Sequence, residues 1–283
     1  MNTTITIKVI KTLQSTVRIN ELIEEAFLEF DRVVKKYTRF NEDSELSNLN
    51  RNSGKWVTVS KEFFYLIEFM LDISNRTNCA FDPTVIDFLE IYGYDKDYDF
   101  SKLDNPSLDN IVKSKLKNRP SPLSIQLDRK ASSVRLIQGQ KIDLGAVGKG
   151  FAIDLAYARL GSEIDDFLID AGGDIRVKGR NEQSNLWNIE LKSQDTNNKI
   201  KSLGFIELTD EALASSGSWA RKFKQFHHLI NPTNGMPAIK KYNTVFVKAN
   251  TAIEADAWAT ALFIGDEQVF DLPSNIMFIK DGR

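Results

Sequence analysis

The chain has 283 residues, a formal net charge of −2 and a pI near 5.9, with 42% hydrophobic and 27% charged residues. Its length allows one large domain or two interleaved ones, and its slightly acidic balance gives no general attraction for nucleic acid or acidic lipid. The single cysteine, Cys79, excludes an internal disulfide and cysteine-cluster metal sites, and only two histidines argue against a zinc site.

Residues 1–14 alternate apolar and polar side chains, which predicts a strand. They lack the long apolar segment and the small-residue cleavage site of a secretory signal. No apolar run elsewhere approaches the roughly 20 residues that a membrane helix needs. We therefore expect a cytoplasmic protein without a membrane span.

Helical spacing of apolar residues predicts a long amphipathic helix from Asn20 to Tyr37, ending in basic residues that suit a helix C-terminus. A polar segment follows, and Ser60 is a plausible N-cap for a second helix. Residues 95–119 mix lysine with aspartate and carry few aromatic residues, which is typical of an exposed insertion with one surface helix.

The second half predicts strands at "FLID", "IRVKG", "LWNIELK", "GFIELT" and "NTVFVKA", followed by a helix at about Ala252 to Ile264. Strands and helices alternate irregularly, which favours an α+β fold over a doubly wound sheet. Because there is no internal repeat, low-complexity tract or obvious linker, we expect residues 1–283 to form a single domain.

The segment "IDLGAVGKGFAIDLA" places a glycine-rich turn at the start of a helix. Gly145, Gly148 and Gly150 are expected to allow positive φ and close approach to a ligand, while the N–H groups of the helix start favour an anion. Lys149 adds a positive charge there. The spacing matches neither the Rossmann nor the phosphate-loop pattern, and such a segment can also be a turn and nothing more.

The C-terminal helix carries Asp256 and Thr260, four residues apart and therefore on one face. A carboxylate and a hydroxyl suit a hard cation such as Mg²⁺, although this spacing is also typical of a solvated face or a local hydrogen bond. The surrounding alanines and Trp258 predict a buried helix, and a buried aspartate needs a partner. That context favours a metal or a buried network.

Three further motifs are open to a structural and a functional interpretation. His227 and His228 adjoin in a strand-like run, so at most one faces a given pocket, where it could act as a general base. Asp82 and Thr84 flank Pro83 and could simply cap the next helix. "DAGGD" predicts a hairpin turn with a close-approach backbone at its two glycines.

Taken in order, "SELSNLN", "FDPTV", "DLGAVGKG", "AGGDIRVKG", "ASSG", "HHLINPTNGMP" and "ADAWATALF" resemble the ApbE family of flavin transferases, from Thr38 to roughly Asp266. The resemblance implies mixed or antiparallel sheets with packed helices and an FAD site in a cleft between two interleaved subdomains. It also implies an enzyme that uses FAD and Mg²⁺ to attach FMN covalently to a threonine or serine of a target protein.

The resemblance assigns roles by position. It implies His228 as the base and Ala146 (through its backbone oxygen), Asp256 and Thr260 as magnesium ligands. The residues that it places against FAD are Phe40, Ala80, Phe81, Asp82, Thr84, Asp143, Lys149, Gly172, Gly173 and Leu229. Phe40 stands where the family often has tyrosine, and Asn234 stands where it usually has threonine.

With a protein hydroxyl as nucleophile, such a site performs phosphoryl transfer and releases AMP. With water as nucleophile the same site is an FAD pyrophosphatase that forms FMN and AMP. A third alternative is a flavin-binding protein without turnover. The predicted magnesium ligands and base favour the enzymes, whereas the target protein cannot be read from the chain.

Overall fold

A six-stranded antiparallel sheet is the largest sheet of this computed structural model, which describes residues 3–10, 12–194, 199–217, 222–223, 226–238 and 242–282. Its strand order is β1 (Ile5–Val9), β5 (Phe167–Ala171), β6 (Asp174–Lys178), β9 (Ala212–Gly217), β14 (Tyr242–Ala249) and β15 (Met277–Gly282). Strands far apart in the sequence are therefore neighbours. In particular, β9 lies between β6 and β14.

Smaller antiparallel sheets complete the strand content. They are β2 (Val57–Thr58), β4 (Ser133–Arg135) and β3 (Gln126–Asp128); β7 (Trp187–Gln194) and β8 (Ile200–Leu208); β10 (Lys222–Phe223) and β11 (Phe226–His227); and β12 (Ile230–Asn231) and β13 (Met236–Pro237). Every strand pair in the described residues is antiparallel.

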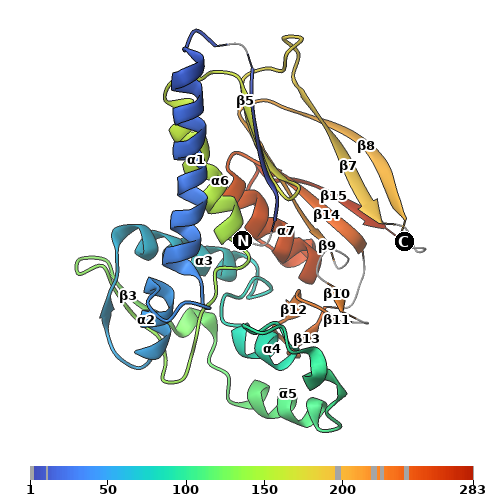
Figure 1. Ribbon diagram of the computed structural model, residues 1–283. Helices are drawn as coiled ribbons and strands as arrows, with labels where there is room; N and C mark the ends of the chain where they lie inside the picture. Colours follow the sequence, from blue (N-terminus) through green and yellow to red (C-terminus); the bar gives the residue numbers. More distant parts are fainter. Residues whose placement is uncertain are drawn as a thin grey trace.

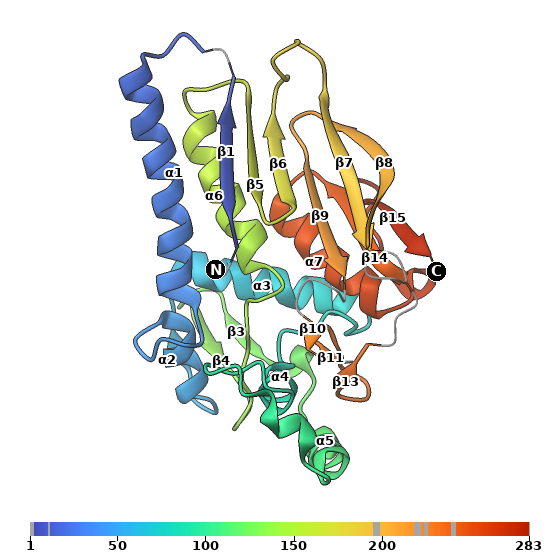
Figure 2. The ribbon, with the colours of Figure 1, turned by 45° about the vertical axis from the view of Figure 1, so that its right-hand side comes forward.

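The described residues contain seven α-helices. They are α1 (Thr16–Tyr37), α2 (Glu45–Arg51), α3 (Lys61–Arg76), α4 (Ile86–Ile91), α5 (Leu108–Lys117), α6 (Gly148–Gly161) and α7 (Ala252–Ile264). Short 3₁₀ turns cover Phe100–Asp104, Pro122–Ser124 and Glu267–Val269. Figures 1 and 2 show α1, α6 and α7 beside the six-stranded sheet, with α2 to α5 and the three-stranded sheet below. The predicted α+β fold with antiparallel sheets is confirmed.

Sequence patterns predicted some of the helix ends correctly and missed others. Helix α1 begins four residues before the predicted Asn20, because the hydroxyl of Ser15 accepts the N–H of Arg18 and caps the helix there. Ser60 caps α3 as predicted, and α7 has its predicted bounds. The polar segment before α3 contains the short helix α2, which the sequence did not predict. No helix in the described ranges has the length and hydropathy needed to cross a membrane.

Helices α6 and α7 cross at Gly150, and each receives a carboxylate from the other. Asp154 of α6 accepts the N–H groups of Ala252 and Ile253 at the start of α7, at 2.8 and 2.9 Å. Asp256 of α7 accepts the N–H of Gly150 at the start of α6, at 3.1 Å. Both helix starts therefore hold a negative charge where the backbone dipoles favour it.

The glycines around the start of α6 do not have the predicted conformation. None of Gly145, Gly148 and Gly150 has a positive φ, so that expectation is wrong. Gly150 is needed for packing, because a Cβ there would lie 2.6 Å from the carbonyl carbon of Ala252 and 2.7 Å from the Cα of Ile253. The absent side chain lets the two helix backbones touch.

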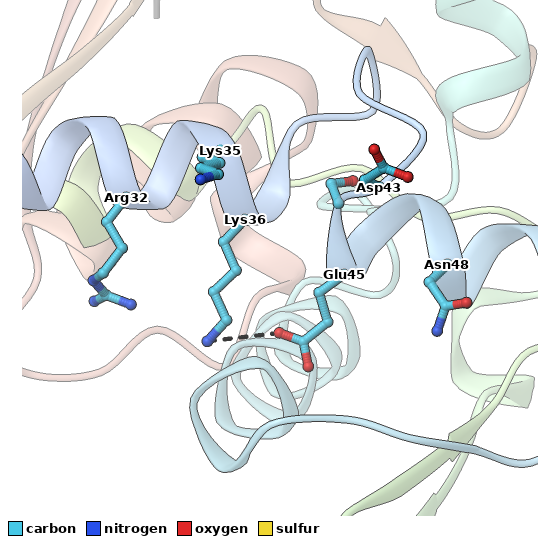
Figure 3. A pocket seen from close by; sticks show the side chains of 7 residues that line it. Arg32, Lys35, Lys36, Asp43, Glu45 and Asn48 are labelled. Carbon is cyan, nitrogen blue, oxygen red and sulfur yellow. Dashed lines mark ion pairs between the residues drawn. The ribbon is translucent and has the colours of Figure 1, made fainter.

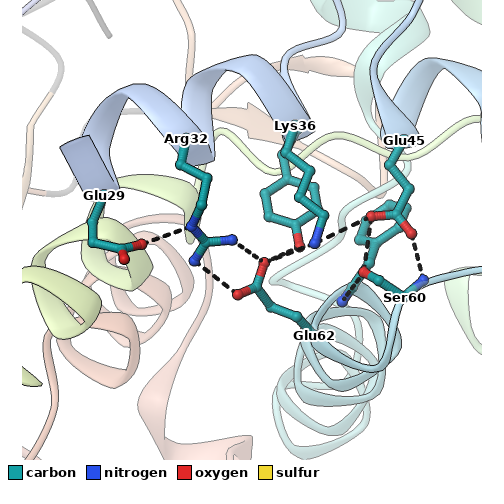
Figure 4. A network of polar contacts seen from close by, with 8 residues as sticks. Glu29, Arg32, Lys36, Glu45, Ser60 and Glu62 are labelled. Atoms are coloured by element: carbon teal, nitrogen blue, oxygen red, sulfur yellow. Dashed lines mark hydrogen bonds and ion pairs between the residues drawn. The ribbon is translucent and has the colours of Figure 1, made fainter.

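Glu62 at the start of α3 ties that helix to the end of α1 (Figure 4). Its carboxylate accepts two hydrogen bonds from Arg32, at 2.9 and 2.8 Å, one from Lys36 at 3.1 Å and one from the hydroxyl of Tyr37. Burial raises the pKa of Glu62, but the bonds from Arg32, Tyr37 and Lys36 outweigh it and lower the pKa to about 2.

The Glu62 network predicts a pH-dependent contribution to stability. Since the folded pKa lies below the unfolded value of 4.5, the contribution is complete above pH 4.5 and is lost as the pH falls toward 2. We expect Glu62→Gln to lower the free energy of unfolding by about 1–3 kcal/mol at pH 7, with a shrinking difference below pH 4.5. Urea unfolding at pH 7 and pH 3 measures this. Glu68→Gln, which removes the exposed pair with Arg129, is the control, and an equal loss at both pH values for Glu62→Gln would contradict the prediction.

The crossing at Gly150 predicts that Gly150→Ala destabilises the fold. Alanine is the better helix former by about 1 kcal/mol, but its methyl group would force α6 and α7 apart. We expect a net loss of about 1–3 kcal/mol in urea unfolding. Gly148→Ala is the matched control, because a Cβ there meets nothing closer than 3.8 Å. Equal stability of the two variants would show that the crossing adapts without cost.

Candidate functional site

Lys149 lies between two buried carboxylates at the start of α6. Its ammonium contacts the carboxylate of Asp174, which is 2% exposed, and lies 3.8 Å from that of Asp256, which is 6% exposed. Asp174 is the first residue of β6 and also accepts the N–H of Ser215 from β9 at 3.2 Å. We call Lys149, Asp174 and Asp256 the charge cluster.

Thr260 lies one turn after Asp256 on α7 and is also buried. Its hydroxyl oxygen is 3.4 Å from that of Ser216 on β9. The "ASSG" segment is therefore strand β9, whose Ser215 and Ser216 contact Asp174 and Thr260, respectively.

Two of the predicted magnesium ligands lie in this region. Asp256 and Thr260 present a carboxylate and a hydroxyl from one buried helix face, and the Gly150 N–H anchors Asp256 to the start of α6, four residues after Ala146. Such hard oxygen donors fit Mg²⁺. No three His, Cys, Asp or Glu side chains gather as a metal site in the part of the chain that the structure describes, but the predicted set contains one carboxylate and so lies outside that pattern.

Asp143 connects the glycine turn to two other motifs. Its N–H donates to the carbonyl of Pro83 at 2.8 Å, and its carboxylate accepts the N–H of Gly145 at 3.0 Å. The guanidinium of Arg39 lies 3.8 Å from the same carboxylate and 4.8 Å from the ring centre of Phe40, which is 39% exposed. Phe40 and Asp143 thus both lie beside one arginine.

Asp82 and Thr84 form a buried polar group rather than a helix cap. Helix α4 starts after Val85 without a side-chain cap, so the capping interpretation is wrong. Instead, Asp82 accepts the N–H and hydroxyl of Thr84, both at 2.7 Å, and the Arg119 guanidinium donates to both side chains. Ala80 and Phe81 precede them in the loop after α3, and Phe81 is buried in the main core.

The two histidines point to different surroundings, as adjacent residues of an extended segment do; His227 ends β11 and His228 follows it. His227 is buried; its Nδ1 accepts the N–H of Leu229 at 3.3 Å, and its Nε2 lies 3.1 Å from the carbonyl of Ala238. These contacts assign His227 a structural role as a neutral ring. His228 is half-buried and packs edge-on against Tyr94, with ring centres 6.2 Å apart.

Gly172 and Gly173 form the two-residue turn of the β5–β6 hairpin, with φ values of 67° and 92°. Positive φ at both positions is typical of a type I′ turn, which confirms the predicted hairpin. The turn leads directly into Asp174, so the hairpin delivers a residue of the charge cluster.

A surface cavity of about 460 Å³ lies elsewhere, between the end of α1 and the start of α2 (Figure 3). It is lined by Arg32, Lys35, Lys36, Asp43, Ser44, Glu45 and Asn48. Two of its cations are engaged within the protein, because Arg32 and Lys36 bind Glu62 and Lys36 lies 3.6 Å from Glu45. None of the predicted site residues lines this cavity, and it is therefore not the candidate site.

Three residues of the candidate site were not predicted from the sequence. Asp174 was noted only as the end of a turn, while Arg39 and Arg119 carried no local signal. Asp174 had one usable signal, a carboxylate placed immediately after a glycine hairpin and before a buried strand. The arginines bind partners far along the chain, which no local pattern reveals.

The fold and the site define an α+β protein in which a lysine and two carboxylates meet at a helix crossing beside an antiparallel sheet. The model of the ApbE family matches residues 1–275, and the chain belongs to this family. The family predicted from the motifs is confirmed.

Named relatives agree with this membership. The chain is 28% identical over 254 residues to the FAD:protein FMN transferase of Buchnera aphidicola subsp. Schizaphis graminum, covering 87% of this chain and 72% of the relative. It is 26% identical over 256 residues to the protein of the same name from Escherichia coli K12, with the same shares covered.

Solved structures share the fold. The ApbE protein of Thermotoga maritima superimposes with a TM-score of 0.80 at 26% identity, over 94% of this chain and 89% of the other. The flavin transferase ApbE of Vibrio cholerae gives a TM-score of 0.79 over 99% and 94%, but its 21% identity supports the fold alone.

The buried pair of Arg119 and Asp82 predicts a strong coupling. Removing one partner leaves a charge without compensation, so we expect Arg119→Met to lower the free energy of unfolding by about 3–5 kcal/mol. The double variant Arg119→Met/Asp82→Asn should recover most of this loss. Urea unfolding of the complete double-mutant cycle measures the coupling, and Lys115→Met, which removes a more exposed pair with Asp87, is the control. Additive losses would contradict the prediction.

Proposed function

We propose that this chain is a magnesium-dependent FAD:protein FMN transferase, which moves FMN from FAD to a threonine or serine hydroxyl of a target flavoprotein. The observation that best supports the proposal is the convergence of Lys149 and Asp256 from segments more than a hundred residues apart. The relatives' shared name supports flavin transfer as the reaction.

In this proposal Asp256, Thr260 and the carbonyl of Ala146 would hold Mg²⁺, which when bound draws charge from the pyrophosphate oxygens of FAD. Lys149 adds a positive charge at the same place, where charge develops during phosphoryl transfer. The Phe40 ring, beside the guanidinium of Arg39, offers a flat surface to the flavin. Asp143 and the Ala80–Thr84 loop complete the proposed FAD contacts, together with Gly172, Gly173 and Leu229. We place these contacts in a cleft between two interleaved subdomains.

His228 is the proposed general base. It takes the proton of the acceptor hydroxyl as that oxygen attacks the phosphorus on the FMN side. A phosphoester bond forms, the pyrophosphate bond breaks, and AMP leaves with the bridging oxygen and accepts a proton. The edge contact with Tyr94 holds the imidazole, and Tyr94 is itself held by Arg39, which donates to its carbonyl.

Incubation with FAD, Mg²⁺ and a candidate flavoprotein tests the proposal. Flavin fluorescence on the target in a denaturing gel, dependent on Mg²⁺, supports transfer. FMN and AMP formed without a target would support an FAD pyrophosphatase instead. FAD bound but recovered intact in every condition would leave a flavin-binding protein and overturn both enzymatic functions.

The role of His228 predicts a separation of binding from turnover. We expect His228→Gln to lower the transfer rate by about 10²–10⁴-fold, because proton removal is lost, while the Kd for FAD changes less than threefold. Single-turnover transfer and titration of flavin fluorescence measure the two quantities. Transfer within tenfold of the parent chain would remove His228 as the base.

A further inference from the structure

Asp174 is the second carboxylate beside Lys149, and it reaches that position from the sheet. The β5–β6 hairpin turn places it at the start of β6, and the N–H of Ser215 on β9 fixes its second oxygen at 3.2 Å. The side chain is 2% exposed. A carboxylate buried to this extent requires a cation, and Lys149 supplies it.

The ammonium group of Lys149 lies closer to Asp174 than to Asp256. It is in contact with Asp174 but 3.8 Å from Asp256, beyond hydrogen-bond distance. Asp256 is instead held by the backbone N–H of Gly150, which is fixed by the crossing of α6 and α7. Lys149 therefore lies closer to Asp174, while Asp256 also accepts a backbone N–H, although the four-carbon side chain of lysine is long enough to reach either carboxylate.

We infer that Asp174 is a positioning residue that holds the Lys149 ammonium away from Asp256 and so keeps the Asp256 carboxylate available to a divalent cation. The inference rests on the proposed function, because Asp256 acts there as a magnesium ligand. Without Asp174, the ammonium turns toward the remaining carboxylate and competes with the divalent cation for it.

This inference predicts that the effect of Asp174 depends on Lys149. In the absence of FAD, Mn²⁺ can be titrated into the full chain, and electron paramagnetic resonance then gives the free Mn²⁺ and its Kd. We expect Asp174→Asn to weaken Mn²⁺ binding at least tenfold. In the Lys149→Met background the same substitution should change the Kd less than threefold, because no ammonium remains to compete.

The substitutions are chosen to preserve the fold. Asparagine has the shape of aspartate and keeps an oxygen for the N–H of Ser215, and methionine retains most of the apolar length of lysine. The double variant Lys149→Met/Asp174→Asn lacks both the ammonium of Lys149 and the carboxylate of Asp174, so it tests the inference even where Lys149→Met alone is unstable. The Kd of the double variant for Mn²⁺ should then be at least threefold lower than that of Asp174→Asn. Asp256→Asn controls for the site and should abolish the tight binding.

The outcomes distinguish a failure of the inference about Asp174 from a failure of Asp256 as the metal ligand. Equal weakening by Asp174→Asn in both backgrounds would show that Asp174 attracts the cation directly, which overturns the inference but leaves the proposed function intact. Unchanged binding in Asp174→Asn would also overturn the inference alone. A parent chain that binds no Mn²⁺, or binds it equally after Asp256→Asn, would overturn the assigned metal ligand and the inference with it.

Discussion

The crossing of α6 and α7 at Gly150 determines the geometry of the site. Two helix starts, each with unpaired N–H groups, face one another there, and each is satisfied by a carboxylate of the opposite helix. Asp154 has a second partner in Arg176, at 2.6 Å, although burial still raises the pKa of Asp154. Because the absent Cβ of Gly150 brings the backbones together, Asp256 is fixed within hydrogen-bond distance of the glycine turn. The proposed metal ligand is therefore positioned by helix packing rather than by a loop.

The other parts of the site are attached to this crossing in two ways. The sheet contributes rigid elements, since β6 carries Asp174 and β9 places its serines against Asp174 and Thr260. The remaining candidates lie in loops, which are tied down by long-range polar contacts. The Asn50 side chain exchanges two hydrogen bonds of 2.9 Å with the backbone of Ile142, and Arg119 holds Asp82 and Thr84. Residues that act on a substrate need this kind of support to keep their geometry.

Sequence patterns predicted the elements better than the contacts between them. Helix α7 and the cap of α3 have local signals, and both were found at their predicted positions. Helix α2 was missed because seven mostly polar residues carry no clear apolar period. The conformation of Gly150 was misjudged because a glycine can serve close packing as well as positive φ, and only its neighbours from α7 decide which. The ordered motifs predicted the family, but the partner of Lys149 depends on the strand order of the sheet.

Two polar networks of similar composition arrange their charges differently. At Glu62, three side chains donate to one carboxylate, which saturates the acceptor and lowers its pKa to about 2. At Lys149, one ammonium is shared by two carboxylates that are more deeply buried. A saturated network changes little when a cation approaches, because its carboxylate already has several donors. A shared ammonium can be redistributed, since a second cation that binds one carboxylate leaves the lysine wholly to the other. This is the arrangement that the proposed binding of a divalent cation at Asp256 requires, with Asp174 as the carboxylate that the lysine keeps.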